Sequence, residues 1–257
     1  MFCACSETQS QRITPGAERG ELYLADLKDK NVGLITNHSA LVKEGHLVDF
    51  LLSNQINIVK IYTSEHGFRG DKSDGAVIDN EVDEKTGIPL ISLYKTTKKP
   101  NPEMLEGIDI LIFDIQDVGM RFYTFISTLT YAMEAAAENG LEFMVLDRPN
   151  PNAFYVDGPV LDTSYASFVG LHKVPIAYGM TIGEYASMVK GEKWINKSED
   201  LELNVIPNAH YAHDSIYQLP VAPSPNLPNA KSILLYPSLC LLEAANVSVG
   251  RGTVSYT

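Results

Sequence analysis

Residues 108–147 read IDILIFDIQDVGMRFYTFISTLTYAMEAAAENGLEFMVLD, and this stretch decides the fold. An apolar run over 108–115 is followed by a segment with helical spacing of apolar residues, 122–140, and by a second apolar run, 141–147. Asn139-Gly140 supplies the signal that ends the helix. Strands that are apolar throughout are buried on both faces, so the stretch predicts two parallel strands joined by a helix.

The same alternation continues on both sides of this stretch. Near-continuous apolar runs separated by helices indicate an α/β fold, in which a mostly parallel sheet carries helices on both faces. The patterns predict strands at 31–36, 56–64, 88–94 and 201–207, and helices at 45–55, 101–107 and 181–194.

The composition limits the classes of partner. With 257 residues, of which 45% are hydrophobic, the chain can bury a substantial core. A formal net charge of −12 argues against binding to nucleic acid or to an anionic membrane surface, because both need clustered Lys and Arg. Cys3, Cys5 and Cys240 lack the spacing of a zinc site. No run reaches the roughly 20 apolar residues of a membrane span.

The two ends of the chain differ from its centre. Ala4-Cys5, followed by a polar tether, is similar to the end of a bacterial lipoprotein signal, which makes Cys5 a candidate lipid anchor; an ordinary N-terminus with incidental thiols is the alternative. We therefore assign residues 1–20 to a leader or tether and 21–230 to one domain. The proline-rich segment 219–232 marks the boundary, because proline disfavours helices and central strands.

Polar residues follow each of four predicted strands. Ligands of open parallel sheets bind outside the carboxyl ends of the strands, so we expect a binding or catalytic face at this edge. Any single strand-end Asp or Asn is also a common helix cap, but the set as a whole favours a site. The residues are Asn37, His38 and Ser39; Ser64, Glu65, His66, Arg69 and Asp71; Asp114, Gln116, Asp117 and Arg121; and Asp147, Arg148 and Asn150.

Two cofactor hypotheses can be weighed from the motifs. The first strand leads into GLITNHSALVKEG, which has neither G-x-G-x-x-G nor a P-loop lysine, so a dinucleotide cofactor is not expected. Carboxylates beside amides and arginines suit acid–base chemistry on a neutral polar substrate such as a sugar. A metal site remains a weaker alternative, because its candidate ligands lack recognisable spacing. These ligands are His38, His66, Asp114, Asp117 and Asp147.

Five motifs together resemble the NamZ family of exo-acting β-N-acetylmuramidases, from about residue 20 to residue 253. The resemblance implies a Rossmann-like N-terminal domain, a smaller C-terminal α/β domain, and removal of N-acetylmuramic acid from the non-reducing ends of peptidoglycan fragments without metal or nucleotide. Because the sequence stops at VSYT, residues 231–257 would be only the beginning of a truncated second domain. The motifs are GLITNHSA (33–40), SEHGFRGD (64–71), the stretch from 108 to 136, VLDRPNP (145–151) and EAANVSVGRGT (243–253).

The resemblance suggests catalytic roles at the strand ends. Glu65, beside apolar Phe68, is the expected general acid, because an apolar environment raises the pKa of a carboxyl group. His66 is expected to hydrogen-bond Glu65 or the sugar. Asp114 and Asp117 are candidates for the second carboxylate or for positioning the acetamido group, and fixing arginines is an equally good interpretation of both.

Substrate-binding roles follow from the chemistry of muramic acid. Its lactyl carboxylate suits a guanidinium group, which makes Arg69, Arg121 and Arg148 candidates, although at least one is expected to pair with Asp117 or Asp147. Tyr123 offers a ring face to the sugar, with core packing as the alternative. The remaining candidate binding residues are Asn37, Gln116, Asp147, Asn150, Glu243, Asn246 and Arg251.

Three functions therefore compete. The leading hypothesis is a periplasmic or extracellular glycoside hydrolase that acts on peptidoglycan-derived muramyl saccharides. A metal-dependent hydrolase of the cell envelope is the second. A lipoprotein that binds cell-wall sugar without cleaving it is the third.

Overall fold

The fold is known from a computed structural model that describes residues 11–64, 68, 81–93 and 97–246. Within this part of the chain, seven strands form one sheet in the order β5-β6-β4-β1-β7-β8-β9, and all neighbours are parallel except β5 and β6. The mostly parallel α/β sheet predicted from the sequence is confirmed. The strands are β1 (Asn31–Thr36), β4 (Asn57–Thr63), β5 (Glu81–Val82), β6 (Pro89–Ser92), β7 (Ile110–Asp114), β8 (Glu142–Leu146) and β9 (Leu203–Ile206).

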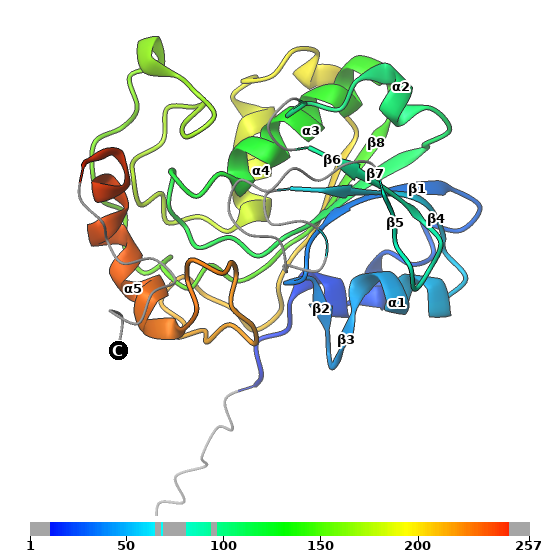
Figure 1. The fold of residues 1–257 in the computed structure, drawn as a ribbon, viewed down its shortest axis with the longest axis horizontal. Coiled ribbons are helices and arrows are strands. Elements are labelled where there is room, and N and C mark those ends of the chain that lie inside the picture. The colour runs from blue at the N-terminus through cyan, green and yellow to red at the C-terminus, as the bar shows by residue number, and fades with distance from the viewer. Residues whose placement is uncertain (1–10, 65–67, 69–80, 94–96, 247–257) are drawn as a thin grey trace, which may run out of the picture.

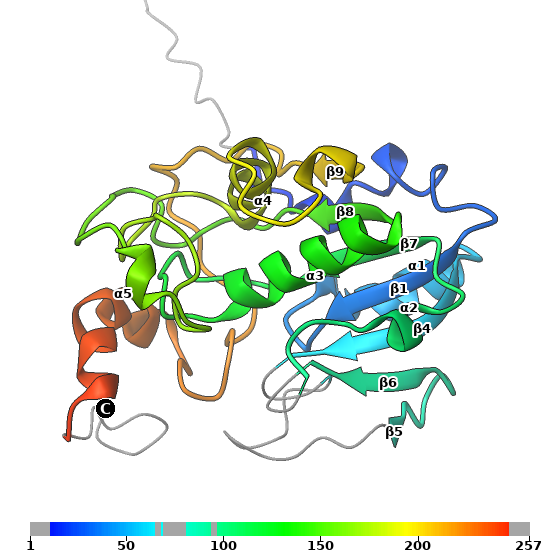
Figure 2. The ribbon, with the colours of Figure 1, turned by 90° about the horizontal axis from the view of Figure 1, so that it is seen from above.

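The register aligns the carboxyl ends of the central strands. Thr36 at the end of β1 is paired with Thr63 of β4 on one side and with Asp114 of β7 on the other. The residues that follow these three strands therefore emerge side by side at the carboxyl ends of the strands, which form one edge of the sheet. Figure 2 shows the arrowheads of β1, β4 and β6 pointing the same way, with α5 lying beyond this edge.

The helices begin and end where the sequence provides capping residues. The side chain of Asn101 accepts a hydrogen bond from Met104 N at the start of α2, and Gly140 ends α3 with a φ of 67°. Thr181 and Glu184 form a capping box at the start of α4. The helices are α1 (Leu47–Ser53), α2 (Pro102–Leu105), α3 (Phe125–Asn139), α4 (Ile182–Gly191) and α5 (Ala230–Leu239).

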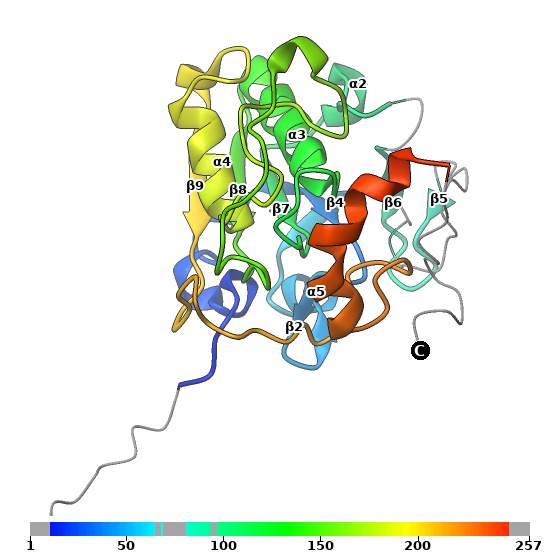
Figure 3. The ribbon, with the colours of Figure 1, turned by 90° about the vertical axis from the view of Figure 1, so that its left-hand side faces the viewer.

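Layers on both faces of the sheet explain why its central strands are apolar throughout. α3 and α4 cover one face, while α1 and the short turns η1 (Gly16–Glu18) and η2 (Gly20–Leu22) lie on the other (Figures 1 and 3). In β7, Phe113 joins the core under α3 and α4, and the adjacent Ile112 joins the core on the α1 side. Both side chains are fully buried.

The segment between β1 and α1 holds a small hairpin that the sequence patterns did not predict. β2 (Leu41–Val42) and β3 (Gly45–His46) pair antiparallel in a two-stranded sheet of their own. Two residues per strand are too few for a detectable alternation, which explains the omission. His46 ends the hairpin and also caps α1, because its Nδ1 accepts a hydrogen bond from Val48 N.

The start of α3 also differs from the prediction. The helix begins at Phe125 rather than at residue 122, because Met120 forms an isolated bridge with Ala177 and the chain turns before the helix starts. α5 and the following η5 (Cys240–Ala244) pack on this turn, where Met120 and Ile233 share a cluster of buried side chains. No helix in the described ranges is both long and apolar enough to cross a bilayer.

The N-terminal segment is fixed to the sheet through Gly16. Gly16 N donates a hydrogen bond of 2.8 Å to Asp147 O, directly after β8. A Cβ atom at this position would lie 2.2 Å from Ile206 O and 2.7 Å from Asp147 N. Both atoms belong to the backbone, so the contact has little freedom to relax.

We expect Gly16→Ala to lower the free energy of unfolding by about 1–3 kcal/mol, because backbone must move to admit the methyl group. The change would be measured by urea denaturation monitored by circular dichroism. Gly191→Ala is the matched control, because a Cβ atom at the end of α4 meets no atom within 4 Å. Equal stabilities of the two variants would contradict the packing argument.

Candidate functional site

Two side-chain links tie the carboxyl ends of the strands together. Ser39 Oγ, after β1, accepts a hydrogen bond of 3.0 Å from Gln116 N, after β7. Arg148, after β8, pairs with Asp114 at the end of β7. The polar residues predicted at the ends of β1, β7 and β8 therefore lie at one edge of the sheet.

The Arg148–Asp114 pair is buried and bidentate. Arg148 Nε donates to Asp114 Oδ1 at 2.5 Å, and Nη2 donates to Asp114 Oδ2 at 2.9 Å and to Leu41 O at 3.1 Å. The two side chains are only 2% and 0% exposed. The pair joins the ends of β7 and β8 to the β2–β3 hairpin, so the fold itself uses both charges.

Asp117 and Asp147 each hold a turn. Asp117 Oδ2 accepts hydrogen bonds from Gly119 N, at 2.6 Å, and from the Tyr178 hydroxyl. Asp147 accepts from Gly183 N and from Asn208 Nδ2, each at 2.8 Å. Burial raises the pKa of Asp117 to about 7 and that of Asp147 to about 6, so both carboxyl groups hold protons far more readily than exposed ones.

Three further predicted binding residues also have partners within the fold. Arg121 Nη1 donates to Val174 O at 2.5 Å and to Pro159 O at 3.0 Å. Asn150 Nδ2 donates to Met180 O at 2.8 Å, and its Oδ1 accepts from a backbone N–H at 2.8 Å. Tyr123 packs edge-on against the rings of Phe125 and Tyr236.

Five of the polar residues predicted for the site, and the candidate lipid-anchor cysteine, lie outside the described residues. Glu243 and Asn246 are described and exposed, in and just after η5. The residues outside are Glu65, His66, Arg69, Asp71, Arg251 and Cys5.

The described residues on either side of 65–67 are both buried beside β1. Ser64, which is 1% exposed, follows β4 directly. Phe68 is 4% exposed, and its ring lies edge-on against His46 with centroids 5.0 Å apart. His46 Nε2 in turn donates a hydrogen bond of 2.8 Å to Asn37 O. The motif that begins at Ser64 is thus anchored at two points next to the end of β1.

Buried polar atoms without a hydrogen-bond partner in the described part of the chain gather at the same edge. Asn37 Nδ2 and Gln116 Oε1 belong to predicted binding residues, and His38 Nδ1 belongs to a strand-end residue that was also named as a candidate metal ligand. Leaving such atoms unpaired costs about 1–3 kcal/mol each, so the group marks a place for water or a polar ligand. The hydroxyl group of Ser64, named among the strand-end residues, is also unpartnered, and the sequence reasoning missed Thr63 and Ser224, whose hydroxyl groups are in the same state.

Asp117 Oδ1 and Arg121 Nε are also unpartnered among the described residues, but both residues use their other polar atoms to hold the fold. The remaining atoms of the group are uncharged. They offer an amide donor, amide and imidazole acceptors, and hydroxyl groups that act as either, which suits a neutral hydroxyl- or amide-bearing ligand. Within the described residues, no three His, Cys, Asp or Glu side chains come together as a metal site.

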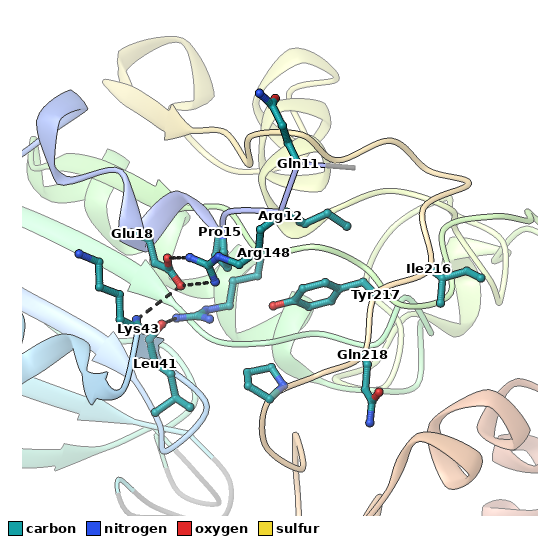
Figure 4. Close-up of a pocket in the computed structure, with 12 residues that line it drawn as sticks. Gln11, Arg12, Pro15, Glu18, Leu41, Lys43, Arg148, Ile216, Tyr217 and Gln218 are labelled. Carbon is teal, nitrogen blue, oxygen red and sulfur yellow. Dashed lines mark hydrogen bonds and ion pairs between the residues drawn. The ribbon is translucent and has the colours of Figure 1, made fainter. Parts of the chain in front are cut away.

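A cavity of about 410 Å³ lies on the other side of Arg148, a volume suited to a small ligand (Figure 4). Tyr217 directs its hydroxyl toward the part of the cavity where Arg148 lies, and Arg12 pairs with Glu18 on the same side of the cavity as Arg148. Burial raises the pKa of Tyr217, which keeps its hydroxyl a neutral donor. The cavity is lined by Gln11, Arg12, Ile13, Pro15, Glu18, Leu41, Lys43, Arg148, Ile216, Tyr217, Gln218 and Pro220.

We expect Arg148→Met to lower the free energy of unfolding by about 3–5 kcal/mol, because it leaves the Asp114 carboxylate buried and unpaired. Adding Asp114→Asn should restore part of this loss, since the double variant buries no charge. Urea denaturation of both single variants and the double variant gives the coupling energy.

Lys30→Met is the control for this prediction. Lys30 pairs with Glu142 at the opposite edge of the sheet, but the two side chains are 27% and 39% exposed. Breaking such a partly exposed pair should cost no more than about 1 kcal/mol. If Arg148→Met lowers the free energy of unfolding no more than Lys30→Met does, the stabilising role assigned to the Arg148–Asp114 pair is refuted.

We expect Asp117 to make stability fall as pH rises. Its folded pKa of about 7 lies above the ordinary value of 3.8, so its stabilising effect is complete below about pH 4 and is lost as pH rises through 7. Asp117→Asn keeps a neutral side chain at every pH, and should therefore gain stability relative to the wild type between pH 4 and pH 8. Thermal unfolding midpoints across this range measure the difference, and Asp26→Asn, at an exposed position, is the control. A constant gap between wild type and Asp117→Asn would show that the carboxyl group does not titrate in this window.

The chain is similar to a curated protein over most of its length. Peptidoglycan β-N-acetylmuramidase NamZ of Bacillus subtilis (strain 168) is 49% identical over 238 residues, which cover 90% of this chain and 56% of the relative. This chain therefore spans about half the length of the curated relative it matches.

Two crystal structures of DUF1343 family proteins from Bacteroides fragilis NCTC 9343 have the same fold. One superposes with a TM-score of 0.86 at 47% identity, covering 95% of this chain and 65% of that protein. The other has a TM-score of 0.83 at 40% identity, covering 90% and 60%. Residues 32–231 match the family profile described as the N-terminal part of the exo-β-N-acetylmuramidase NamZ. The chain belongs to the NamZ family, and most of its central sheet lies in the residues that match the N-terminal part of that family.

Proposed function

We propose that this protein is an exo-acting glycoside hydrolase that releases N-acetylmuramic acid from the non-reducing ends of peptidoglycan fragments. The observation that carries this proposal is the 49% identity, over 90% of the chain, to a protein named peptidoglycan β-N-acetylmuramidase. The uncharged, unpartnered polar atoms at the ends of β1, β4 and β7 support it, because they suit the hydroxyl and acetamido groups of a sugar.

Glu65 is the proposed general acid. It directly follows Ser64, which is buried at the carboxyl end of β4, and it precedes Phe68, which is buried against His46. Protonating the glycosidic oxygen at neutral pH requires a carboxyl group whose pKa is raised, and apolar neighbours raise it. The three carboxyl groups predicted nearby, Asp114, Asp117 and Asp147, all have structural partners, which favours Glu65 for this role.

Arg69 is the proposed partner of the lactyl carboxylate. Of the three arginines predicted for this contact, Arg148 is paired with Asp114 and Arg121 donates to backbone carbonyl groups. A guanidinium group that the fold already uses is a poor receptor for a further carboxylate, so Arg69 is favoured by elimination.

The substrate class sets the proposed location. Peptidoglycan-derived muramyl saccharides are found at the cell envelope, so we place the protein in the periplasm or outside the cell. Cys5 is the proposed lipid anchor, because of the lipoprotein-like residues around it.

Glu65→Gln should lower kcat for release of muramic acid by about 10²–10⁴-fold, because the amide cannot supply the proton. Affinity for the sugar should stay within about threefold, since the amide keeps the shape of the carboxyl group. Turnover would be followed with a chromogenic N-acetylmuramic acid glycoside, and binding by calorimetry.

Glu84→Gln is the matched control, because Glu84 is an exposed glutamate of the next described segment and should tolerate the change. Full activity of Glu65→Gln would remove Glu65 from the mechanism. Loss of wild-type activity in a chelator would instead favour a metal-dependent hydrolase. Binding without turnover by the wild type would favour a non-catalytic sugar-binding protein.

A further inference from the structure

His38 holds its imidazole ring in one tautomer at the end of β1. Its Nε2 atom lies 2.8 Å from Ala222 O, in the proline-rich segment that crosses this edge of the sheet. A backbone carbonyl only accepts hydrogen bonds, so Nε2 must carry the hydrogen atom. In the neutral ring, this leaves the lone pair on Nδ1, which becomes an acceptor.

Nδ1 of His38 is buried and has no hydrogen-bond partner among the described residues. It belongs to the group of unpartnered atoms at the strand ends. Asn37 Nδ2 is on the preceding residue, and Ser64 follows Thr63, the register partner of Thr36. Ser224 Oγ is two residues beyond the carbonyl that fixes the ring. No described residue supplies a donor for this acceptor, which leaves it open to a donor from a ligand.

We propose that His38 is a substrate-binding residue that accepts, through Nδ1, a hydrogen bond from an O–H or N–H group of a bound N-acetylated sugar. This proposal rests on the proposed function. A lone pair attracts a donor and repels an anion, so His38 contacts a hydroxyl or acetamido N–H group and not the lactyl carboxylate. The Ala222 carbonyl is the positioning group that makes Nδ1 the acceptor.

A purely structural role would use the other nitrogen. If His38 only tethers the proline-rich segment, then its Nε2–H bond to Ala222 is the whole of its function. The two roles can be separated, because the amide of Asn reaches about as far as Nδ1, whereas the amide of Gln reaches about as far as Nε2. His38→Gln therefore keeps a donor for Ala222 and removes the Nδ1 acceptor, and His38→Asn does the reverse.

The test is calorimetric titration of wild type and both variants with N-acetylmuramic acid, together with their thermal unfolding midpoints. We expect His38→Gln to keep the midpoint and to weaken sugar binding by about tenfold, the effect of losing one buried hydrogen bond. His38→Asn should lower the midpoint and weaken binding less than His38→Gln does.

Sugar binding by the wild type distinguishes failure of the His38 proposal from failure of the proposed function. If wild type binds the sugar and His38→Gln binds it equally well, the role of His38 is overturned and the proposed function stands. If wild type binds no muramyl sugar, both are overturned.

A spectroscopic measurement on the wild type covers the case in which a variant does not fold. Long-range ¹H–¹⁵N correlation spectra report which imidazole nitrogen carries hydrogen. We expect the Nε2–H tautomer for His38, with a shift of its Nδ1 resonance when sugar is added. An Nδ1 resonance that stays unchanged at saturation would overturn the proposal.

Discussion

The carboxyl edge of the sheet depends on one buried ion pair, Arg148–Asp114. Two charges with almost no solvent contact are stable only when each satisfies the other, and here two parallel hydrogen bonds do so. The same guanidinium group also binds Leu41 O, so a single side chain fixes the ends of two strands and a hairpin. Because removing either charge would leave the other buried, this edge cannot rearrange locally without a large cost.

This constraint divides the polar residues at the edge into two groups. The carboxyl groups of Asp114 and Asp147, like the amide of Asn150, have partners that hold loops in place. The amides of Asn37 and Gln116 are only half used, and each leaves one buried atom unpartnered within the described residues. The Arg148–Asp114 pair therefore serves the fold, whereas the amides of Asn37 and Gln116 each keep one buried atom for a ligand.

The sequence predicted the fold more fully than the site. Every strand that ends at the candidate site was predicted, because burial on both faces leaves a continuous apolar run such as residues 108–115, and the caps at Asn101 and Gly140 located the helix ends. The order of the strands was not predicted, since hydrophobic patterns carry no information about neighbours. The hairpin at 41–46 was too short to give a pattern.

Within the site, the sequence showed which residues lie at strand ends but not what each one contacts. Asp147 and Asn150 looked like ligand-binding residues, yet their partners are Gly183 and Met180, more than 25 positions away. Ser224 gave no signal, because it lies in a proline-rich segment that is far from β1 in the sequence and contacts His38 through Ala222. Such pairings depend on tertiary packing, which no local pattern encodes.

That proline-rich segment and the residues before it connect the cavity beside Arg148 with the unpartnered polar atoms at the strand ends. Ile216, Tyr217, Gln218 and Pro220 line the cavity beside Arg148, and Ala222 holds the ring of His38 two residues later. Proline restricts the backbone of such a segment, so its two contacts are not independent. A shift that opened the cavity would also move the carbonyl that sets the tautomer of His38. The position of this segment therefore affects both the shape of the cavity beside Arg148 and the orientation of the acceptor, Nδ1 of His38.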